Sequence, residues 1–258
     1  MSEEVDDYIT LCALIHAQEG MGKSWLGQST PAPRLVLDAE GGSRNPWRAV
    51  NGVGVKQRKV TWNPAKDEPP LADGSWDTCH VPIREYGDVQ HAFNWLNGGD
   101  HDFKSVTLDS VTEIQQRCKD AIGGENALRI QDWDLMMIRM SLLMRRFRDL
   151  VSHPTAPLDA VIFLALSEQK NDKWRPWVQG GLAKALPGYV DVEGYLYVQE
   201  LDTDDENGEP EYERRLLIHP LEGYAAKDRT HTLTQHYGKV IKQPDIEQML
   251  AVLNEEEV

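Results

Sequence analysis

The sequence contains no apolar run that approaches the roughly 18–20 residues needed to span a bilayer. Its first residues also lack the basic-then-apolar pattern of a secretory signal. Only three cysteines are present, Cys12, Cys79 and Cys118, and their odd number and spacing disfavour a disulfide framework or a zinc site. Basic residues are also scarce, with 27 Lys and Arg against 42 Asp and Glu, so broad electrostatic attraction to nucleic acid is not expected. These absences predict a cytoplasmic protein in a reducing environment, not integral to a membrane.

The composition is that of an ordinary globular chain. Apolar residues make up 40% of the 258 residues and charged residues 27%, which excludes a wholly disordered or collagen-like protein. Without internal repeats or a flexible linker, residues 1–258 are expected to form a single domain. Residues 41–82 are rich in Gly, Pro, Asn and Trp and are expected to be a long loop or a small β insertion. Residues 254–258 form an acidic tail.

Short β-rich apolar runs alternate with helical patterns along most of the chain, as is typical of a parallel sheet with crossover helices. Strands are predicted at 10–16, 34–37, 78–83, 105–108 and 160–166, and helices from residue 23 and at 88–96, 111–121, 130–151 and 245–253. Residues 189–201 and 212–219 flank the acidic turn 202–210, which indicates an antiparallel hairpin. The predicted fold is therefore α/β, with a mostly parallel central sheet flanked by helices and an antiparallel C-terminal hairpin extension.

The strongest local motif is Ala17-Gln18-Glu19-Gly20-Met21-Gly22-Lys23-Ser24, directly after the first predicted strand. It matches the phosphate-binding pattern G-x-x-x-x-G-K-[ST], except that Ala17 replaces the first glycine. The two glycines would let backbone N–H groups surround phosphates at a helix N-terminus, while Lys23 reaches the β- and γ-phosphates and Ser24 ligates Mg²⁺. The predicted nucleotide-binding residues are Glu19, Gly20, Met21, Gly22, Lys23, Ser24 and Trp25. The alternative is a chance match in a turn, which the position between strand and helix disfavours.

Two strand-end carboxylates complete this pattern. Asp109 closes the apolar run 105–108 and is a candidate magnesium ligand, although Asp followed by Ser is also a common way to start a helix. Glu40 follows the strand at 34–37, where a carboxylate can orient and deprotonate a water molecule. The alternative for Glu40 is a solvated acid at a strand end.

The order of these motifs resembles the RecA-type recombinase core: a phosphate loop, then Asp38-Ala39-Glu40, then Asp109-Ser110, then an apolar strand, a variable loop and Gly180-Gly181. More closely, the chain is similar to phage-encoded, core-only relatives described as nucleotide-binding or single-strand annealing proteins. The resemblance covers residues 11–253 and implies an ATPase with ATP and Mg²⁺ as cofactors. One departure is Ala165-Leu166-Ser167-Glu168, where the family has a polar Asn-Gln sensor.

The variable loop, residues 167–179, contains cations interleaved with indoles. Lys170, Lys173 and Arg175 would follow a single strand's backbone while Trp174 and Trp177 stack on its bases. In the resemblance this loop corresponds to the second DNA-binding loop, and residues 123–129 to the first, with Arg129 as a further contact. The alternative is a β-hairpin whose two tryptophans close the edge of the core.

Lys227 and Arg229 lie two residues apart, a spacing that points both side chains to one side of a strand. In the resemblance, such a pair reaches the γ-phosphate of a neighbouring subunit, so hydrolysis would need a homo-oligomer, a filament or a ring. Two solvated surface cations are the alternative. The resemblance implies single-stranded DNA as partner, with room for a single-strand-binding protein, and recombination or annealing in phage as the function. The competing functions are a P-loop ATPase acting on a protein partner and a nucleotide-binding scaffold with little turnover.

Overall fold

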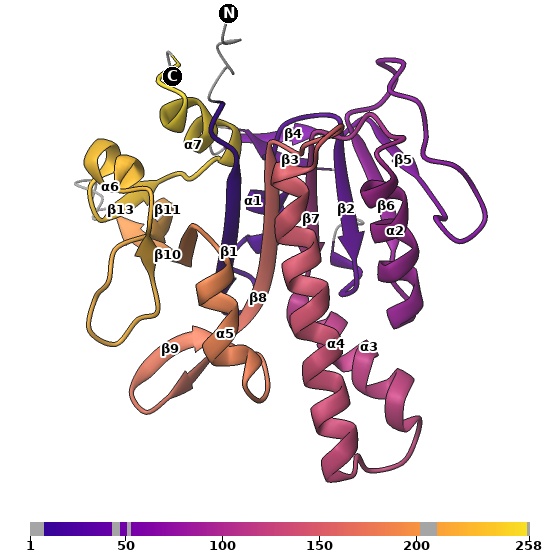
Figure 1. Cartoon of the computed structure of the whole chain (residues 1–258). Coiled ribbons are helices and arrows are strands. Elements are labelled where there is room, and N and C mark those ends of the chain that lie inside the picture. The colour runs from indigo at the N-terminus through magenta and orange to yellow at the C-terminus, as the bar shows by residue number, and fades with distance from the viewer. Residues whose placement is uncertain (1–7, 43–46, 51–52, 202–210, 257–258) are drawn as a thin grey trace, which may run out of the picture.

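The computed structural model describes residues 8–42, 47–50, 53–201 and 211–256. Eleven strands form one sheet, whose main path runs β13-β11-β10-β1-β8-β7-β2-β6-β5, while β12 pairs with β10 and β9 pairs with β8 (Figure 1). The parallel strands are β1 (Leu11–Ala17), β2 (Arg34–Asp38), β5 (Lys59–Thr61), β6 (Thr78–Pro82), β7 (Ser105–Asp109), β8 (Ala160–Lys170) and β10 (Val192–Leu201). Strand β8 lies between β1 and β7, so the strands that precede the phosphate loop and end at Asp109 are second neighbours.

Helices cover both faces of this sheet. They are α1 (Lys23–Gly27), α2 (Tyr86–Gly98), α3 (Val111–Gly123), α4 (Ile130–Asp149), α5 (Leu182–Tyr189), α6 (Thr232–Tyr237) and α7 (Ile246–Leu253), with a 3₁₀ turn, η2, at Leu150–Ser152. Helix α1 begins at Lys23 as predicted but is only five residues long. None of the described helices combines the length and apolarity needed to cross a membrane.

Successive side chains of β1 point to opposite faces of the sheet and belong to two hydrophobic cores. Cys12 and Leu14 pack on one face with α2, α3, α4 and α5, while Ala13 and Ile15 pack on the other with α1 and α7. Every residue of β1 is buried, as expected for a central parallel strand covered on both sides. The phosphate loop therefore follows a strand that is covered on both faces of the sheet.

The C-terminal extension is antiparallel. Strand β10 pairs with β11 (Glu211–Leu217), which pairs with β13 (Val240–Lys242), and β12 (Lys227–Asp228) adds to β10. The acidic turn 202–210 and the last two residues of the tail lie outside the described residues. The predicted α/β fold, with its mostly parallel sheet, flanking helices and antiparallel hairpin, is confirmed.

Two segments for which the sequence left both loop and β structure open contain strands. In the 41–82 segment, β3 (Trp47–Val50) and β4 (Val53–Lys56) form a separate two-stranded sheet, while β5 extends the main sheet. Trp62 and Trp76 are buried against Phe103. In the 167–179 segment, β8 runs on to Lys170 and returns as β9 (Lys173–Pro176), so this segment is a β-hairpin.

Helix α1 packs so closely on the sheet that it depends on Gly27. A Cβ there would lie 2.7 Å from Cδ1 of Leu164 and 2.8 Å from Cγ2 of Thr107. We expect Gly27→Ala to lower the free energy of unfolding by about 1–3 kcal/mol through overpacking. The matched control is Gly98→Ala at the exposed end of α2, where a Cβ would meet nothing within 4 Å and stability should stay equal or rise slightly. Urea unfolding compares them; equal stability of the two variants would contradict this packing.

Candidate functional site

The two glycines of the phosphate loop adopt the backbone conformation for which glycine is needed. Gly20 has φ +77° and Gly22 has φ +92°, the left-handed region that side chains disfavour. Gly22 immediately precedes α1, and its carbonyl accepts a hydrogen bond from the backbone N of Leu26 at 3.1 Å. The loop therefore turns sharply and leads into a helix N-terminus, the arrangement that presents backbone N–H groups to an anion.

Lys23 is 7% exposed, an unusual burial for a lysine. Its Nζ donates a 3.3 Å hydrogen bond to the carbonyl of Gln18. Burial lowers the pKa of Lys23, and Glu40, Asp109 and Glu19 counteract this decrease by favouring the charged form. A buried ammonium group beside the loop, whose desolvation is only partly offset by nearby carboxylates, is suited to receive the charge of a phosphate chain.

Asp109 ends β7 with both carboxylate oxygens buried, and neither oxygen has a hydrogen-bond partner of good geometry among the residues that the structure describes. Burial raises its pKa from the ordinary 3.8 to about 7; the nearby Ser24 hydroxyl and Lys23 lower it, and Glu40 and Asp38 raise it. Buried carboxylates without partners are rare in folded proteins, and here the hydroxyl of the predicted co-ligand Ser24 is close enough to lower the pKa of the carboxyl. The two residues fit Mg²⁺, which takes few protein ligands when phosphates and water supply the rest. No group of three or more His, Cys, Asp or Glu suited to a metal occurs among the described residues.

Glu40 is held next to Asp109 by the backbone. The carbonyl of Asp109 accepts hydrogen bonds from the backbone N of Ala39 at 2.7 Å and of Glu40 at 3.3 Å. The Ser110 hydroxyl donates to Oε1 of Glu40 and accepts from the backbone N of Glu113 at 3.3 Å, so it also caps α3. The turn Asp109-Ser110 at the end of β7 therefore both caps α3 and holds Glu40 at the site.

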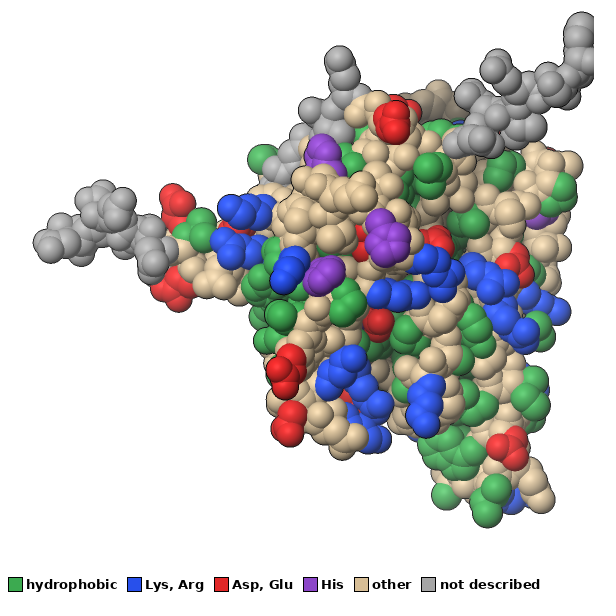
Figure 2. Space-filling model, turned by 60° about the vertical axis from the view of Figure 1, so that its left-hand side comes forward, with side chains coloured by type: hydrophobic (Ala, Val, Ile, Leu, Met, Phe, Trp, Pro, Cys, Tyr) green, Lys and Arg blue, Asp and Glu red, His purple; other side chains and the backbone are tan. Residues whose placement is uncertain are grey.

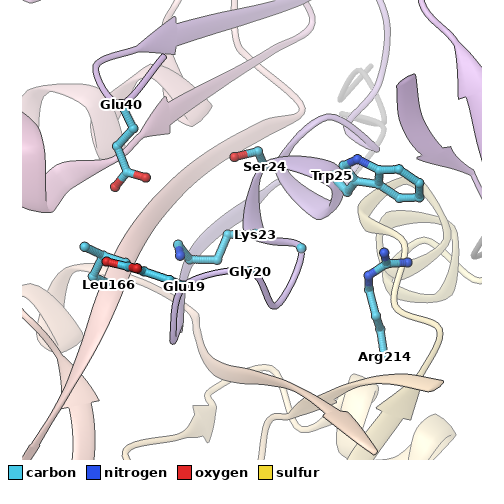
Figure 3. A pocket seen from close by; sticks show the side chains of 9 residues that line it. Glu19, Gly20, Lys23, Ser24, Trp25, Glu40, Leu166 and Arg214 are labelled. Carbon is cyan, nitrogen blue, oxygen red and sulfur yellow. The ribbon is translucent and has the colours of Figure 1, made fainter. Parts of the chain in front are cut away.

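A cavity of about 450 Å³ lies against the phosphate loop and Glu40 (Figure 3). It is lined by Glu19, Gly20, Gly22, Lys23, Ser24, Trp25, Glu40, Leu166 and Arg214. Asp109, the predicted metal ligand, is buried and is not among its lining residues. Of the predicted nucleotide-binding residues, only Met21 does not line it and instead packs against the core on the α1 side. Sequence reasoning missed Arg214 because it comes from β11, nearly 200 residues away, and no local motif marks it. Leu166 occupies the cavity wall near the position expected for a polar sensor.

The β8–β9 hairpin brings two of the predicted DNA-binding cations together. Its turn residues, Asn171 and Asp172, have φ of 51° and 57°, as in a tight two-residue hairpin turn. Lys170 and Lys173 are consequently directly opposite each other in the strand register, and both are exposed. Neither forms an ion pair with a described residue.

The two tryptophans of this hairpin have different surroundings. Trp174 is half-buried and stacks on Tyr195, with ring centroids 6.2 Å apart, and its backbone bonds to Gly223 and Ala225. Trp177 is 45% exposed. Trp174 therefore packs as expected for the hairpin alternative, in which the tryptophans close the edge of the core. Of the two tryptophans, only Trp177 exposes a large part of its indole to solvent.

The remaining predicted cations all have partners in the protein. Arg175 forms a 2.6 Å ion pair with Glu168, and Arg129 caps α4 through a 3.0 Å pair with Asp132.

Lys227 and Arg229 reach the connection that precedes β10. Lys227 donates to the carbonyl of Val190 at 2.8 Å, and Arg229 to that of Gly188 at 3.1 Å. The two cations are close enough that Arg229 contributes to lowering the pKa of Lys227, after burial. Both side chains therefore extend to one place, as their spacing predicts, and neither lines the phosphate-loop cavity of its own chain.

Comparison with known proteins places this geometry in a family. A family model described as an AAA domain matches residues 10–230, and no curated protein matches. The chain is similar to an ATPase from the type III secretion system of pathogenic bacteria, at 15% identity and TM-score 0.44, over 72% of this chain and only 52% of that one. It is also similar to the flagellar accessory protein FlaH from Methanocaldococcus jannaschii, at 9% identity and TM-score 0.39, over 90% and 84% of the chains.

The raised pKa of Asp109 predicts a pH-dependent effect on stability. Between about pH 4 and 7 the folded chain retains a proton that the unfolded chain has lost, so ionisation of Asp109 destabilises the fold as the pH rises through this range. We expect nucleotide-free Asp109→Asn to melt several degrees above the unmodified protein at pH 8, with a smaller difference at pH 5, and to lose Mg²⁺-dependent ATP binding. Thermal melts at both pH values measure this.

The matched control for that experiment is Asp134→Asn, on an exposed position of α4. Its melting temperature should follow that of the unmodified protein at both pH values. An equal change in melting temperature in both variants would show that the pKa of Asp109 is not raised as described.

Proposed function

Because the chain belongs to the AAA domain family of P-loop ATPases, we propose that it is a Mg²⁺-dependent ATPase of the RecA type. In this proposal it assembles on single-stranded DNA and promotes strand exchange or annealing in phage homologous recombination. The nucleotide site described above supports the ATPase part. The DNA part is supported mainly by the tip of the β8–β9 hairpin.

The observation that carries the DNA proposal is the pairing of Lys170 with Lys173. Like charges directly opposite each other on two strands are destabilising, and no described carboxylate forms an ion pair with either one. A polyanion would offset this repulsion. Basic side chains also gather in patches on the face that Figure 2 shows, although the chain as a whole carries a formal charge of −15.

Trp177 complements these cations. Its indole is 45% exposed, while its backbone N donates to the carbonyl of Leu166 at 2.6 Å, and Leu166 lines the phosphate-loop cavity. Base stacking on an exposed indole tolerates any sequence. This short connection also gives a physical route by which nucleotide in the cavity and DNA on the hairpin could influence each other.

In the proposed hydrolysis, Lys23 would neutralise charge on the β- and γ-phosphates, and Ser24 and Asp109 are the residues that would hold Mg²⁺. A bound Mg²⁺ would supply positive charge that stabilises the phosphate chain during transfer. Glu40, oriented by the Ser110 hydroxyl, positions the attacking water and accepts its proton. Lys227 and Arg229 of a neighbouring subunit in a homo-oligomer would place positive charge next to the γ-phosphate.

A second candidate function is a P-loop ATPase that acts on a protein partner without contacting DNA. An apolar stripe on α4 favours it: Leu135, Ile138 and Leu142 are 39%, 65% and 38% exposed and lie at helical spacing on one side of the helix. Exposed apolar groups of this kind are typical of protein contacts. The two candidates predict different responses to DNA.

The deciding experiment is ATP turnover with and without single-stranded DNA, which we expect to stimulate turnover. Trp177→Ala should weaken DNA affinity by about 1–3 kcal/mol at unchanged melting temperature, whereas Trp174→Ala should lower the melting temperature. Lys173→Gln should reduce the slope of log affinity against log salt by about 0.7, the single-strand value per phosphate.

The control for the cation is Lys66→Gln, an exposed lysine after β5 at the far edge of the sheet, where affinity and slope should not change. If the Trp177 and Lys173 variants bind DNA like the unmodified protein, the protein-directed ATPase is the better description.

Complementation tests the role of Lys227 and Arg229. We expect Glu40→Gln to slow turnover by about 100-fold or more, and Lys227→Ala and Arg229→Ala each to lose turnover at wild-type ATP affinity. Mixing Glu40→Gln with Lys227→Ala should recover part of the activity, because some interfaces then join an intact Glu40 to an intact Lys227. Turnover of the mixture is measured after mixed assembly is verified; absence of recovery would place the basic pair outside the neighbour's site.

A further inference from the structure

Arg214 is a half-buried cation without an anionic partner in the described structure. No described carboxylate forms an ion pair with its guanidinium, whereas its neighbour Arg215 is paired with Glu213 at 2.6 Å. Burial lowers the pKa of Arg214, but an arginine remains charged at neutral pH. The strand thus places an uncompensated positive charge on one face and a compensated one on the other.

The position of Arg214 is set by β11 and by Gly22. Residues alternate across a strand, so Arg214 shares a face with Leu216, which packs in the core on the α1 side. A Cβ on Gly22 would lie 2.6 Å from Nε of Arg214, which shows that the guanidinium lies directly against the phosphate loop. Only the absence of a side chain at Gly22 permits this approach.

Trp25 holds the guanidinium at this place. Cζ of Arg214 lies 4.6 Å from the centroid of the Trp25 ring, and Gly54 of β4 approaches the edge of the same ring, because a Cβ there would lie 3.2 Å from it. A cation–π contact is weaker than a charge-assisted hydrogen bond between arginine and phosphate. A phosphate group that enters the cavity can therefore bind the guanidinium in place of its contact with Trp25.

The cavity has two ends, and Arg214 is at the one away from Glu40. In Figure 3, Glu40 lies on one side of Lys23 and Ser24, while Trp25 and Arg214 lie on the other. If Glu40 marks the γ-phosphate, as in the proposed function, then Arg214 faces the α- and β-phosphates. We propose that Arg214 is a second phosphate-binding cation of this site, supplied by the same chain, and that it recognises nucleoside diphosphates and triphosphates alike.

This role differs from that of Lys227 and Arg229, which would contact only a neighbour's γ-phosphate. It rests on the nucleotide site of the proposed function and does not depend on DNA binding or assembly. Calorimetric titration of the full-length protein with ADP, and separately with inorganic pyrophosphate, in the absence of DNA therefore tests it independently.

Arg214→Gln should lower the affinity for both ADP and pyrophosphate roughly ten- to a hundredfold, as loss of a charged hydrogen bond does. Arg215→Gln, the matched control on the opposite face, should bind both ligands normally. Arg214→Lys should fall between, because lysine keeps the charge but lacks the planar fork. Thermal melts accompany each titration, and if Arg214→Gln does not fold, the Arg214→Lys titration decides.

Three results would overturn the proposal. ADP affinity in Arg214→Gln within about twofold of the unmodified protein, or equal affinity in Arg214→Lys when that variant decides, would mean that the guanidinium stays on Trp25 as a structural contact. Loss of ADP affinity with unchanged pyrophosphate affinity would place Arg214 on the nucleoside. Loss of nucleotide binding in Lys23→Ala alone would leave the ATPase assignment intact while removing Arg214 from the phosphate site.

Discussion

The buried carboxylate of Asp109 is the constraint on which the rest of the site depends. Its side-chain oxygens have no hydrogen-bond partner of good geometry among the described residues, while its backbone carbonyl accepts hydrogen bonds from the backbone N of Ala39 and of Glu40. A charge in this position is costly unless a cation arrives. The protein thus keeps a destabilising group at the end of β7, and binding of a metal with a nucleotide would offset that cost.

The sheet order brings the other groups to the same place. Strand β8 separates β1 from β7, which leaves room for the phosphate loop beside Asp109 and lets Leu166 close the cavity wall. The same β8 strand continues past the sheet into the hairpin that carries Lys170 and Lys173. One strand therefore borders the nucleotide site and supports the proposed DNA-binding tip, so movement at one end has a direct covalent path to the other.

Much of the fold and half of the site were predictable because they rest on local patterns. Apolar runs marked the parallel strands, and Gly-x-Gly-Lys-Ser marked the loop, since its backbone conformation needs glycines at Gly20 and Gly22. Strand β9 follows β8 directly, and the sequence left a hairpin there open as the alternative to a DNA-binding loop. The small strands β12 and β13 were not predictable, because each is short and is held by pairing with a distant strand. The role of Trp174 was open for the same reason: its partner, Tyr195, comes from another strand.

The sequence by itself identified the candidate residues for phosphate and Mg²⁺, because the chemistry that they need is encoded in a motif of eight residues and in an acid at a strand end. Only the tertiary structure decided which cations are available. Arg175 and Arg129 are held by Glu168 and Asp132, while Arg214 lies against Gly22 without an ion-pair partner in the described part of the chain. Whether a charge is compensated depends on which side chains lie within a few ångströms, and that is set by the pairing of strands far apart in the chain.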